Sequence, residues 1–234
     1  MKIALLGYGR MGKTIASYAQ QRNHKIVYIL DKEQEEGSLS EADVAINFSV
    51  PEAAVSNIKA ALEQKIPVVS GTTGWLEKYE EVVTFCKTQQ SAFLYASNFS
   101  IGVNLFFKIN QFVAQLMHPH QSAYQTEIQE IHHIHKLDAP SGTAITIAEG
   151  IIKETDYTGW ELDKASQGTL PIEALREGEV PGTHTVHYRS EIDKISIKHE
   201  AYKRDGFALG AVIAAEWLAG KEGIFSMDDV LKIS

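Results

Sequence analysis

A glycine-rich turn close to the start of the chain strongly limits the folds that this sequence can adopt. An apolar run over residues 3–6 leads into Gly7, Gly9 and Gly12, which have the spacing G-x-G-x-x-G, and helix-forming residues continue as far as Ala19. A strand, a tight glycine turn and a helix in this order form the first half of a βαβ unit. The pattern therefore predicts a Rossmann-type dinucleotide-binding domain at the N-terminus.

The second strand of this unit, residues 25–30, places a carboxylate where such folds bind the adenosine ribose. Asp31 follows that strand, about 20 residues after the glycines. Its charge would repel the 2′-phosphate of NADPH, whereas Lys32 and Arg10 could attract it, so we expect both NADH and NADPH to bind. Two simpler interpretations stay open: the glycines could serve packing alone, and Lys32 could be a solvated charge in the acidic segment 31–41.

Strands and helices continue to alternate along the first part of the chain, which favours an α/β fold with a doubly wound parallel sheet. We expect further strands at residues 44–48, 68–70 and 93–96, and helices at residues 52–64 and 76–88. The segments 71–74 and 96–99 leave two of these strands at the edge where such sheets bind ligands, so both are expected to contact the cofactor. Turn chemistry alone would also explain their glycines and amides.

A second domain is expected between residues 100 and 203, with the first domain formed by residues 1–99 and completed by residues 204–234. The apolar helix over residues 206–219 is too short to span a bilayer and is suited to pack back on the first domain. Residues 100–117 form an amphipathic helix that leads into the second domain. The remaining elements, which predict an α+β domain on an open mixed sheet, are strands at 124–133, 183–190 and 194–201, a helix at 143–153 and a polar stretch at 156–168.

Little helix is expected to cover this second sheet. Ile192, Ile195 and Ile197 are interpreted as lying on an exposed sheet face, which would need a partner surface. The second domain is therefore expected to bind the substrate and to mediate oligomerisation, with a homotetramer as the predicted assembly.

The densest group of chemically active residues is EIHHIHKLDAPSGTA, from Glu130 to Ala144. Ser141, Gly142 and Thr143 offer backbone N–H groups at the start of a helix, which is a site suited to a carboxylate or phosphate. Protonatable histidine and lysine side chains stand within a few residues of it. This arrangement predicts an anionic substrate that receives a proton during the reaction.

Other interpretations of the histidines are structural or metal-binding. On a strand, His133 and His135 would share one face, roughly 6 to 7 Å apart. Zinc needs at least a third protein ligand, and Lys136 is a poor neighbour for a cation, so we expect no metal. His135 is expected to be mainly structural, and a serine at a helix N-cap is common without any ligand.

The overall charge and the cysteine count exclude several classes of function. The net charge of −8 argues against binding to nucleic acid or to an anionic membrane surface. The single cysteine, Cys86, allows no internal disulfide, and its place in an amphipathic helix does not suit a nucleophile. The first residues lead directly into the glycine turn without a leader segment, so a cytoplasmic location is expected.

The sequence resembles the dihydrodipicolinate reductases, also called 4-hydroxy-tetrahydrodipicolinate reductases, of lysine and diaminopimelate biosynthesis. The resemblance covers nearly the whole chain and is most specific in HHIHKLDAPSGTA. Further matching segments, in the expected order, are GYGRMG, SGTTG, SNFSIGVN, REGEVPGTHTV and HEAYKRDGFALGAV. It implies an NAD(P)H-dependent reduction of 4-hydroxy-tetrahydrodipicolinate, a small dicarboxylate, to tetrahydrodipicolinate.

The resemblance also implies roles for individual residues. His132 would be the catalytic proton donor or acceptor and Lys136 the proton donor. Residues that would bind the substrate are His133, Gly142 and Thr143, together with the helix-capping Ser141. Residues that would bind the cofactor are Gly7, Tyr8, Gly9, Arg10, Met11, Gly12, Asp31, Lys32, Gly71, Thr72, Thr73, Ala96, Ser97, Asn98 and Phe99.

The sequence departs from the family pattern in three places. The glycine turn resembles a one-residue-shorter version of the commoner family form, and the segment between Asp31 and Val44 is much shorter than usual. Asn47-Phe48-Ser49 stands where many members have Asp-Phe-Thr. Two alternative functions remain, namely another amino-acid dehydrogenase of similar two-domain plan and a non-catalytic NAD(P)-sensing module.

Overall fold

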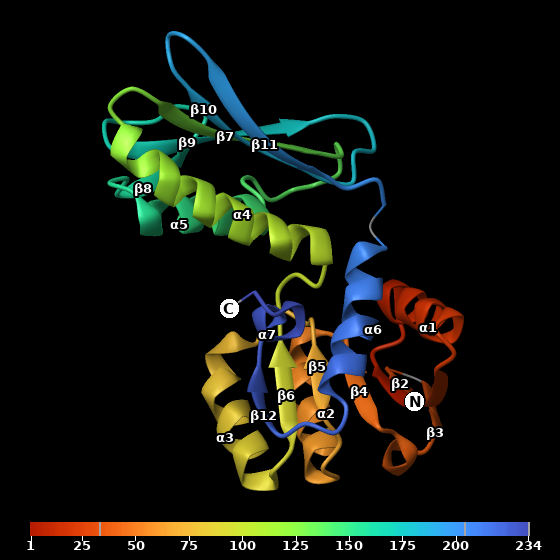
Figure 1. Ribbon diagram of the computed structural model, residues 1–234. Coiled ribbons are helices and arrows are strands. Elements are labelled where there is room, and N and C mark those ends of the chain that lie inside the picture. Colours follow the sequence, from red (N-terminus) through yellow and green to blue (C-terminus); the bar gives the residue numbers. More distant parts are fainter. Residues whose placement is uncertain (33, 204, 234) are drawn as a thin grey trace. The chain divides into compact units, whose positions relative to one another are not determined.

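The computed structural model describes residues 1–32, 34–203 and 205–233, which form two compact units (Figure 1). The first unit consists of Met1–Ile101 and Asp205–Ser234, and the second of Gly102–Arg204. Arg204 and Ser234, which bound the expected C-terminal segment 204–234, lie outside the described residues.

The first unit contains a seven-stranded sheet of the predicted α/β type. Its strand order is β12-β6-β5-β4-β1-β2-β3. All neighbours are parallel except the pair β2 and β3. The strands are β1 (Lys2–Leu6), β2 (Lys25–Asp31), β3 (Gln34–Gly37), β4 (Val44–Asn47), β5 (Val68–Ser70), β6 (Ala92–Tyr95) and β12 (Gly223–Phe225).

Helices cover both faces of this sheet. Along β1, Ile3 and Leu5 pack with helices α1 (Arg10–Gln21) and α6 (Gly206–Leu218), whereas Ala4 and Leu6 pack on the other side with α2 (Pro51–Glu63) and α3 (Tyr79–Gln89). A strand buried on both faces reads as a continuous apolar run, as residues 3–6 do. The helix predicted at 206–219 is thus α6, packed on the first unit as expected.

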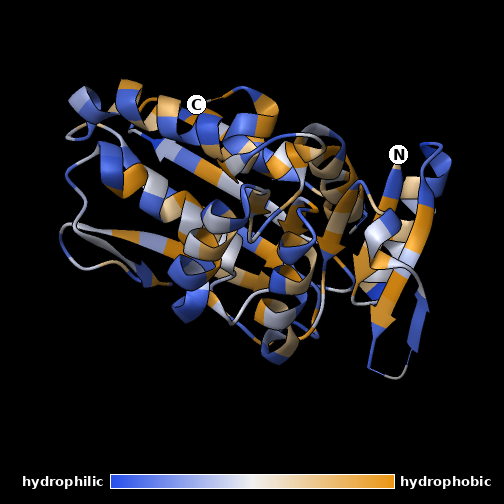
Figure 2. Ribbon diagram, turned by 90° about the horizontal axis from the view of Figure 1, so that it is seen from below, coloured by the Kyte–Doolittle hydropathy of each residue, from blue (hydrophilic) through white to orange (hydrophobic). Residues whose placement is uncertain are grey.

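Two strands of the first unit were not predicted. β3 lies in the segment 31–41, which was interpreted as a loop because of its acidic residues. Those side chains suit an exposed edge strand, and β3, which pairs with β2, is hydrophilic (Figure 2). β12, followed by the short helix α7 (Met227–Leu231), has only three residues and therefore too little pattern to detect.

The second unit contains a mixed five-stranded sheet in the order β11-β10-β7-β9-β8. Helices α4 (Ile101–Met117) and α5 (Gly142–Glu154) bury one face of it around Ile128, Ile172 and Tyr188. The strands are β7 (Gln125–His132), β8 (Gly159–Leu162), β9 (Thr169–Arg176), β10 (Thr183–Arg189) and β11 (Lys194–Glu200). The mixed sheet was predicted, but β8 was missed because residues 156–168 were interpreted as a polar stretch, and no strand was predicted at β9.

The expectation of an apolar open face on this sheet is wrong. Ile197 packs against the helix-covered core, and Ile192, 94% exposed, lies between β10 and β11. Strand alternation puts Ile195 on the same side of β11 as Ile197. The residues that line a hollow on the opposite side are mostly polar and include Glu127, Gln129, Glu173, His187 and Arg189. Among the described residues, no helix is both long and apolar enough to cross a membrane.

Candidate active site

The loops that carry the predicted cofactor residues meet at one edge of the first sheet, beyond the carboxyl ends of its strands. Backbone hydrogen bonds join them: Gly7 N donates to Leu30 O at 2.7 Å, Gly71 N donates to Asn47 O at 3.0 Å, and Ala96 N donates to Ser70 O at 3.2 Å. Ligands of doubly wound sheets bind at this edge. The structure therefore brings the segments 7–12, 71–73 and 96–99 to the predicted ligand-binding edge.

Glycine is required at two positions of this edge. Gly7 has φ +102°, and a Cβ atom there would lie 2.2 Å from the carbonyl oxygen of Phe48. At Gly71 a Cβ would lie 2.2 Å from Cζ of the Phe48 ring. Gly9, by contrast, faces open space, with nothing within 4 Å of an added Cβ, and it caps the N-terminus of α1. This opening beside the first N–H groups of α1 fits the pyrophosphate of a dinucleotide.

A buried polar network that was not predicted supports the loop after β5. Asn47 is fully buried, and its Nδ2 donates to Ser70 Oγ at 3.0 Å and to Thr72 Oγ1 at 3.3 Å. Ser49 N donates to Thr72 Oγ1, and Ser49 Oγ donates to Asn47 Oδ1. The hydroxyl of Thr72 is thus engaged inside the protein. The sequence signal was available, since Asn47 and Ser49 are the residues that depart from the family pattern.

The other predicted cofactor residues differ in exposure. Asp31 is partly buried and accepts a hydrogen bond from Lys32 N at 2.9 Å, whereas the side chain of Lys32 is exposed. Thr73, Ser97, Gly9 and Arg10 are exposed, and Tyr8, Met11, Gly71 and Ala96 are partly buried. Gly12, Asn98 and Phe99 are buried.

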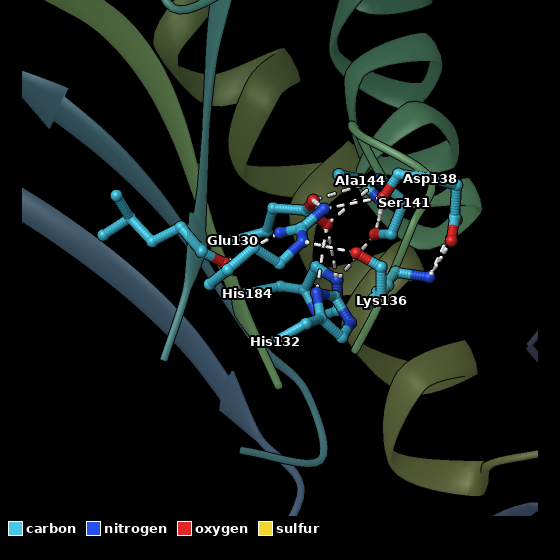
Figure 3. Close-up of polar contacts among 9 residues, drawn as sticks. Glu130, His132, Lys136, Asp138, Ser141, Ala144 and His184 are labelled. Atoms are coloured by element: carbon cyan, nitrogen blue, oxygen red, sulfur yellow. Dashed lines mark hydrogen bonds and ion pairs between the residues drawn. The ribbon is translucent and has the colours of Figure 1, made fainter. Parts of the chain in front are cut away.

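In the second unit, three adjacent strands place charged residues on the face that α4 and α5 cover. Glu130 of β7 is the register partner of His184 on β10, and His132 of β7 is the partner of Arg176 on β9. Strand alternation puts Glu130 and His132 on the same side as the core residue Ile128. The covered face thus changes from apolar to polar towards the N-terminus of α5 (Figure 3).

Glu130 is at the centre of this cluster (Figure 3). Its side chain is fully buried, and both carboxylate oxygens accept from Ser141 N at 3.1 Å. Oε1 lies 3.2 Å from Nη2 of Arg176, and Oε2 lies 3.7 Å from Nε2 of His184. Burial alone would raise the pKa of Glu130, but the nearby His184 and the hydrogen bond from Ser141 outweigh it and lower the pKa to about 2. Glu130 is therefore ionised at neutral pH.

His132 is neutral in the same surroundings. Burial is the largest influence, opposed by the nearby charge of Glu130, and it lowers the pKa of His132 to about 4. Nδ1 of His132 lies 3.4 Å from Oε2 of Glu130, without hydrogen-bond geometry. His184 packs edge-on against His132 with ring centroids 5.1 Å apart, and its Nε2 lies 3.2 Å from Ser141 Oγ.

Lys136 lies in the loop between β7 and α5 and is a second cation of the cluster, beside Arg176. Its Nζ donates to both carboxylate oxygens of Asp138, at 2.7 and 2.8 Å, and this pair lowers the pKa of Asp138. The guanidinium of Arg176 binds the backbone of the same loop: Nε donates to Lys136 O at 3.3 Å and Nη2 donates to Asp138 O at 2.6 Å. Glu130, Arg176, His184 and Asp138 were given no role at the sequence level, although the last three lie in segments that carry the family resemblance.

The predicted anion site at the start of α5 is only partly as expected. Ser141 is the N-cap, and its Oγ accepts from Ala144 N at 3.2 Å. The expectation that Ser141 also offers a free N–H is wrong, because that group donates to Glu130. Gly142 is exposed and Thr143 partly buried, and their N–H groups have no acceptor among the described residues. These two groups remain available for an anion.

The remaining histidines of the motif lie beyond the end of β7, so His133 and His135 do not share a strand face. Their ring centroids are 6.1 Å apart, and Nε2 of the exposed His135 lies 3.3 Å from Glu179. A different trio, Glu130, His132 and His184, has ligand atoms within 4.8 Å of one another, which could suit a metal ion. The guanidinium of Arg176 on the same carboxylate disfavours a further cation there.

Comparison with known proteins identifies the family. Residues 1–99 match the family model described as dihydrodipicolinate reductase, N-terminus, and residues 102–231 match dihydrodipicolinate reductase, C-terminus. The 4-hydroxy-tetrahydrodipicolinate reductase of Christiangramia forsetii is 56% identical over 234 residues, which cover 99% of this chain and 98% of the relative. The chain belongs to the dihydrodipicolinate reductase family. The fold, the reductase activity and the NAD(P)H cofactors predicted from the sequence are those of this family.

More distant relatives agree with this assignment. The 4-hydroxy-tetrahydrodipicolinate reductase of Archaeoglobus fulgidus is 34% identical over 262 residues, covering 99% of this chain and all of the relative. A dipicolinate-bound dihydrodipicolinate reductase from Paenisporosarcina sp. TG-14 has the same fold, with a TM-score of 0.81 at 22% identity, over 97% of each chain.

Proposed function

We propose that this reductase uses NADH or NADPH to reduce 4-hydroxy-tetrahydrodipicolinate to tetrahydrodipicolinate, with Lys136 and His132 as its catalytic residues. The observation that carries this assignment is the second unit's cluster. A cation, a buried neutral imidazole and two open N–H groups at the start of α5 all belong to residues 132–143. Such a group binds a carboxylate and supplies a proton at the same place.

Different residues bind the substrate and transfer the proton. The N–H groups of Gly142 and Thr143 bind one substrate carboxylate, aided by the positive end of the α5 dipole. The 4-hydroxyl of the substrate leaves as water. The ammonium of Lys136 donates to the reduced substrate the proton that balances the hydride, because it is the charged acid of the cluster while His132 is neutral. His132 orients the substrate and exchanges a proton with it through its imidazole, and His133 contacts a second polar group of the substrate.

In the first unit, the glycine turn and the start of α1 hold the pyrophosphate, and Asp31 holds the adenosine ribose. The nicotinamide, when bound, supplies the hydride. The segments 71–73 and 96–99 position it at the carboxyl edge of the sheet. A cytoplasmic location, where reduced nicotinamide cofactors are available, is part of the proposal.

We also propose that the protein assembles as a homotetramer. The support is a stripe of apolar side chains on α4, which stay exposed in the single chain: Leu105, Ile109, Phe112 and Leu116 are between 39% and 61% exposed. Apolar area of this kind commonly marks an interface between copies.

The direct test of the function is a spectrophotometric assay that follows oxidation of NADH and NADPH with freshly prepared 4-hydroxy-tetrahydrodipicolinate. The wild type should oxidise both cofactors. Lys136→Met should lower kcat by roughly 10² to 10⁴ with little change in cofactor affinity. Lys153→Met, which removes an exposed lysine from the last turn of α5, is the matched control and should retain kcat. Cofactor binding without oxidation would contradict the proposal and indicate a non-catalytic module.

A further inference from the structure

The loop from His133 to Pro140 carries Lys136 but has little apolar anchorage. Leu137 is 97% exposed and Ile134 is 59% exposed. Since hydrophobic burial does not hold these residues, the position of the loop depends on polar contacts. One such contact is Ile134 N to Gly178 O at 3.1 Å, at the end of the loop nearest β7.

Arg176, the last residue of β9, supplies the contacts to the middle of the loop. Its Nε donates to Lys136 O, and its Nη2 donates to Asp138 O at 2.6 Å and to Glu130 Oε1 at 3.2 Å. Nη1 donates to Leu175 O at 2.7 Å, which fixes the guanidinium to its own strand. One planar guanidinium therefore binds residues on both sides of Leu137. A lysine ammonium cannot donate hydrogen bonds in all of these directions.

The carboxylate that Arg176 contacts also binds the start of α5. Glu130 accepts from Ser141 N with both oxygens and lies beside His132 and His184. A single chain of contacts thus runs from the backbone of Lys136, through Arg176 and Glu130, to the N-cap of the helix whose next two N–H groups are open.

We propose that Arg176 is a positioning residue for the reduction: through its guanidinium and the buried carboxylate of Glu130, it holds the Lys136 turn and the N-terminus of α5 in fixed register. This inference rests on the proposed function. Arg176 does not itself transfer a proton. It sets where the ammonium of Lys136 lies with respect to a substrate carboxylate on Gly142 and Thr143, and errors of about 1 Å in such placement can cost 10²-fold in rate.

The test compares Arg176→Ala and Arg176→Lys with the wild type, measuring kcat and KM per folded molecule, with and without guanidinium ion at sub-denaturing concentration. We expect Arg176→Ala to lose roughly 10² in kcat, and guanidinium to restore part of that loss by occupying the vacated site. Arg176→Lys should remain folded, because it keeps the charge beside Glu130, and should still lose about tenfold or more in kcat.

Arg22→Ala is the matched control, since Arg22 also binds a carboxylate, Glu216, through two nitrogens, but does so in the first unit. Its kcat should be unchanged and insensitive to guanidinium. If Arg176→Ala does not fold, Arg176→Lys decides the question. Wild-type kcat in either folded variant, or a loss in Arg176→Ala that guanidinium leaves unchanged, would overturn the inference. An inactive wild type would refute the proposed function instead.

Discussion

Glu130 and His132 share a buried site, but Glu130 is an anion and His132 is neutral because their partners differ. Glu130 has His184 Nε2 at 3.7 Å and accepts a hydrogen bond from Ser141 N, and both neighbours favour its anion. His132 has no aligned acceptor for Nδ1 among the described residues, so burial dominates and its pKa falls to about 4. The free enzyme at neutral pH therefore presents a neutral imidazole beside the cationic Lys136, and this arrangement separates the two proposed catalytic roles.

The charge state of His132 gives a prediction for pH dependence. A lowered pKa means that His132 stays neutral as the pH falls and takes up a proton only near pH 4. Because kcat/KM reports on ionisations of the free enzyme, it should show no acidic decline with a midpoint near pH 6.5. Steady-state rates from pH 8 down to about pH 5, with His132→Gln alongside, would check this. An acidic decline near 6.5 that disappears in His132→Gln would contradict it.

At the scale of elements, the start of α5 determines how the substrate is held. The Ser141 N–H is used by Glu130, so only Gly142 and Thr143 remain to bind an anion. A helix N-terminus of this kind needs small side chains, because the anion must approach the backbone closely.

Thr143→Leu should therefore raise the KM for the dicarboxylate by roughly 10- to 100-fold, the equivalent of one lost charge-assisted hydrogen bond, and change the KM for NADPH little. Thr146→Leu alters the exposed threonine one turn later and should leave both constants near wild type. The check is steady-state kinetics with each substrate varied in turn. Equal effects of the two variants would mean that the start of α5 does not bind the substrate.

The elements with strong local patterns were predictable from the sequence. The glycine turn, the apolar runs of β1 and β5 and the cap at Ser141 all carry short-range signals, and their places in the structure agree with the predictions. β3 was hidden by its acidic side chains, and β12 by its length. β8 was hidden in the same way as β3, because it lies within a polar stretch.

The site was predicted less completely, because much of it depends on strand register. Arg176 and Glu130 are 46 residues apart in sequence, and His184 is 43 residues from Ser141. These groups meet only when β9, β7 and β10 pair in the observed register, which residue spacing does not encode. One signal was present: alternation along β7 puts Glu130 on the same side as Ile128, and a charged residue on a buried face usually has a specific partner.

At the scale of the whole molecule, assembly remains a prediction, now on different grounds. The open side of the second sheet is polar around Glu127, Glu173 and Arg189, whereas exposed apolar side chains gather on α4. Light scattering on the purified protein at micromolar concentration should give a mass about four times 25.9 kDa. Phe112→Glu, which places a charge in the α4 stripe, should shift the mass downward if that stripe forms an interface. A wild-type mass of 25.9 kDa would contradict the tetramer.

The proposed reaction transfers hydride from the nicotinamide to a cyclic dicarboxylate. The most direct measurement is mass spectrometry of the product formed with NADPH deuterated at the transferring position of the nicotinamide. Tetrahydrodipicolinate should gain one deuterium for each cofactor oxidised by the wild type, and Lys136→Met should form the same labelled product far more slowly. Oxidation of the cofactor without labelled tetrahydrodipicolinate, or no oxidation at all, would contradict it.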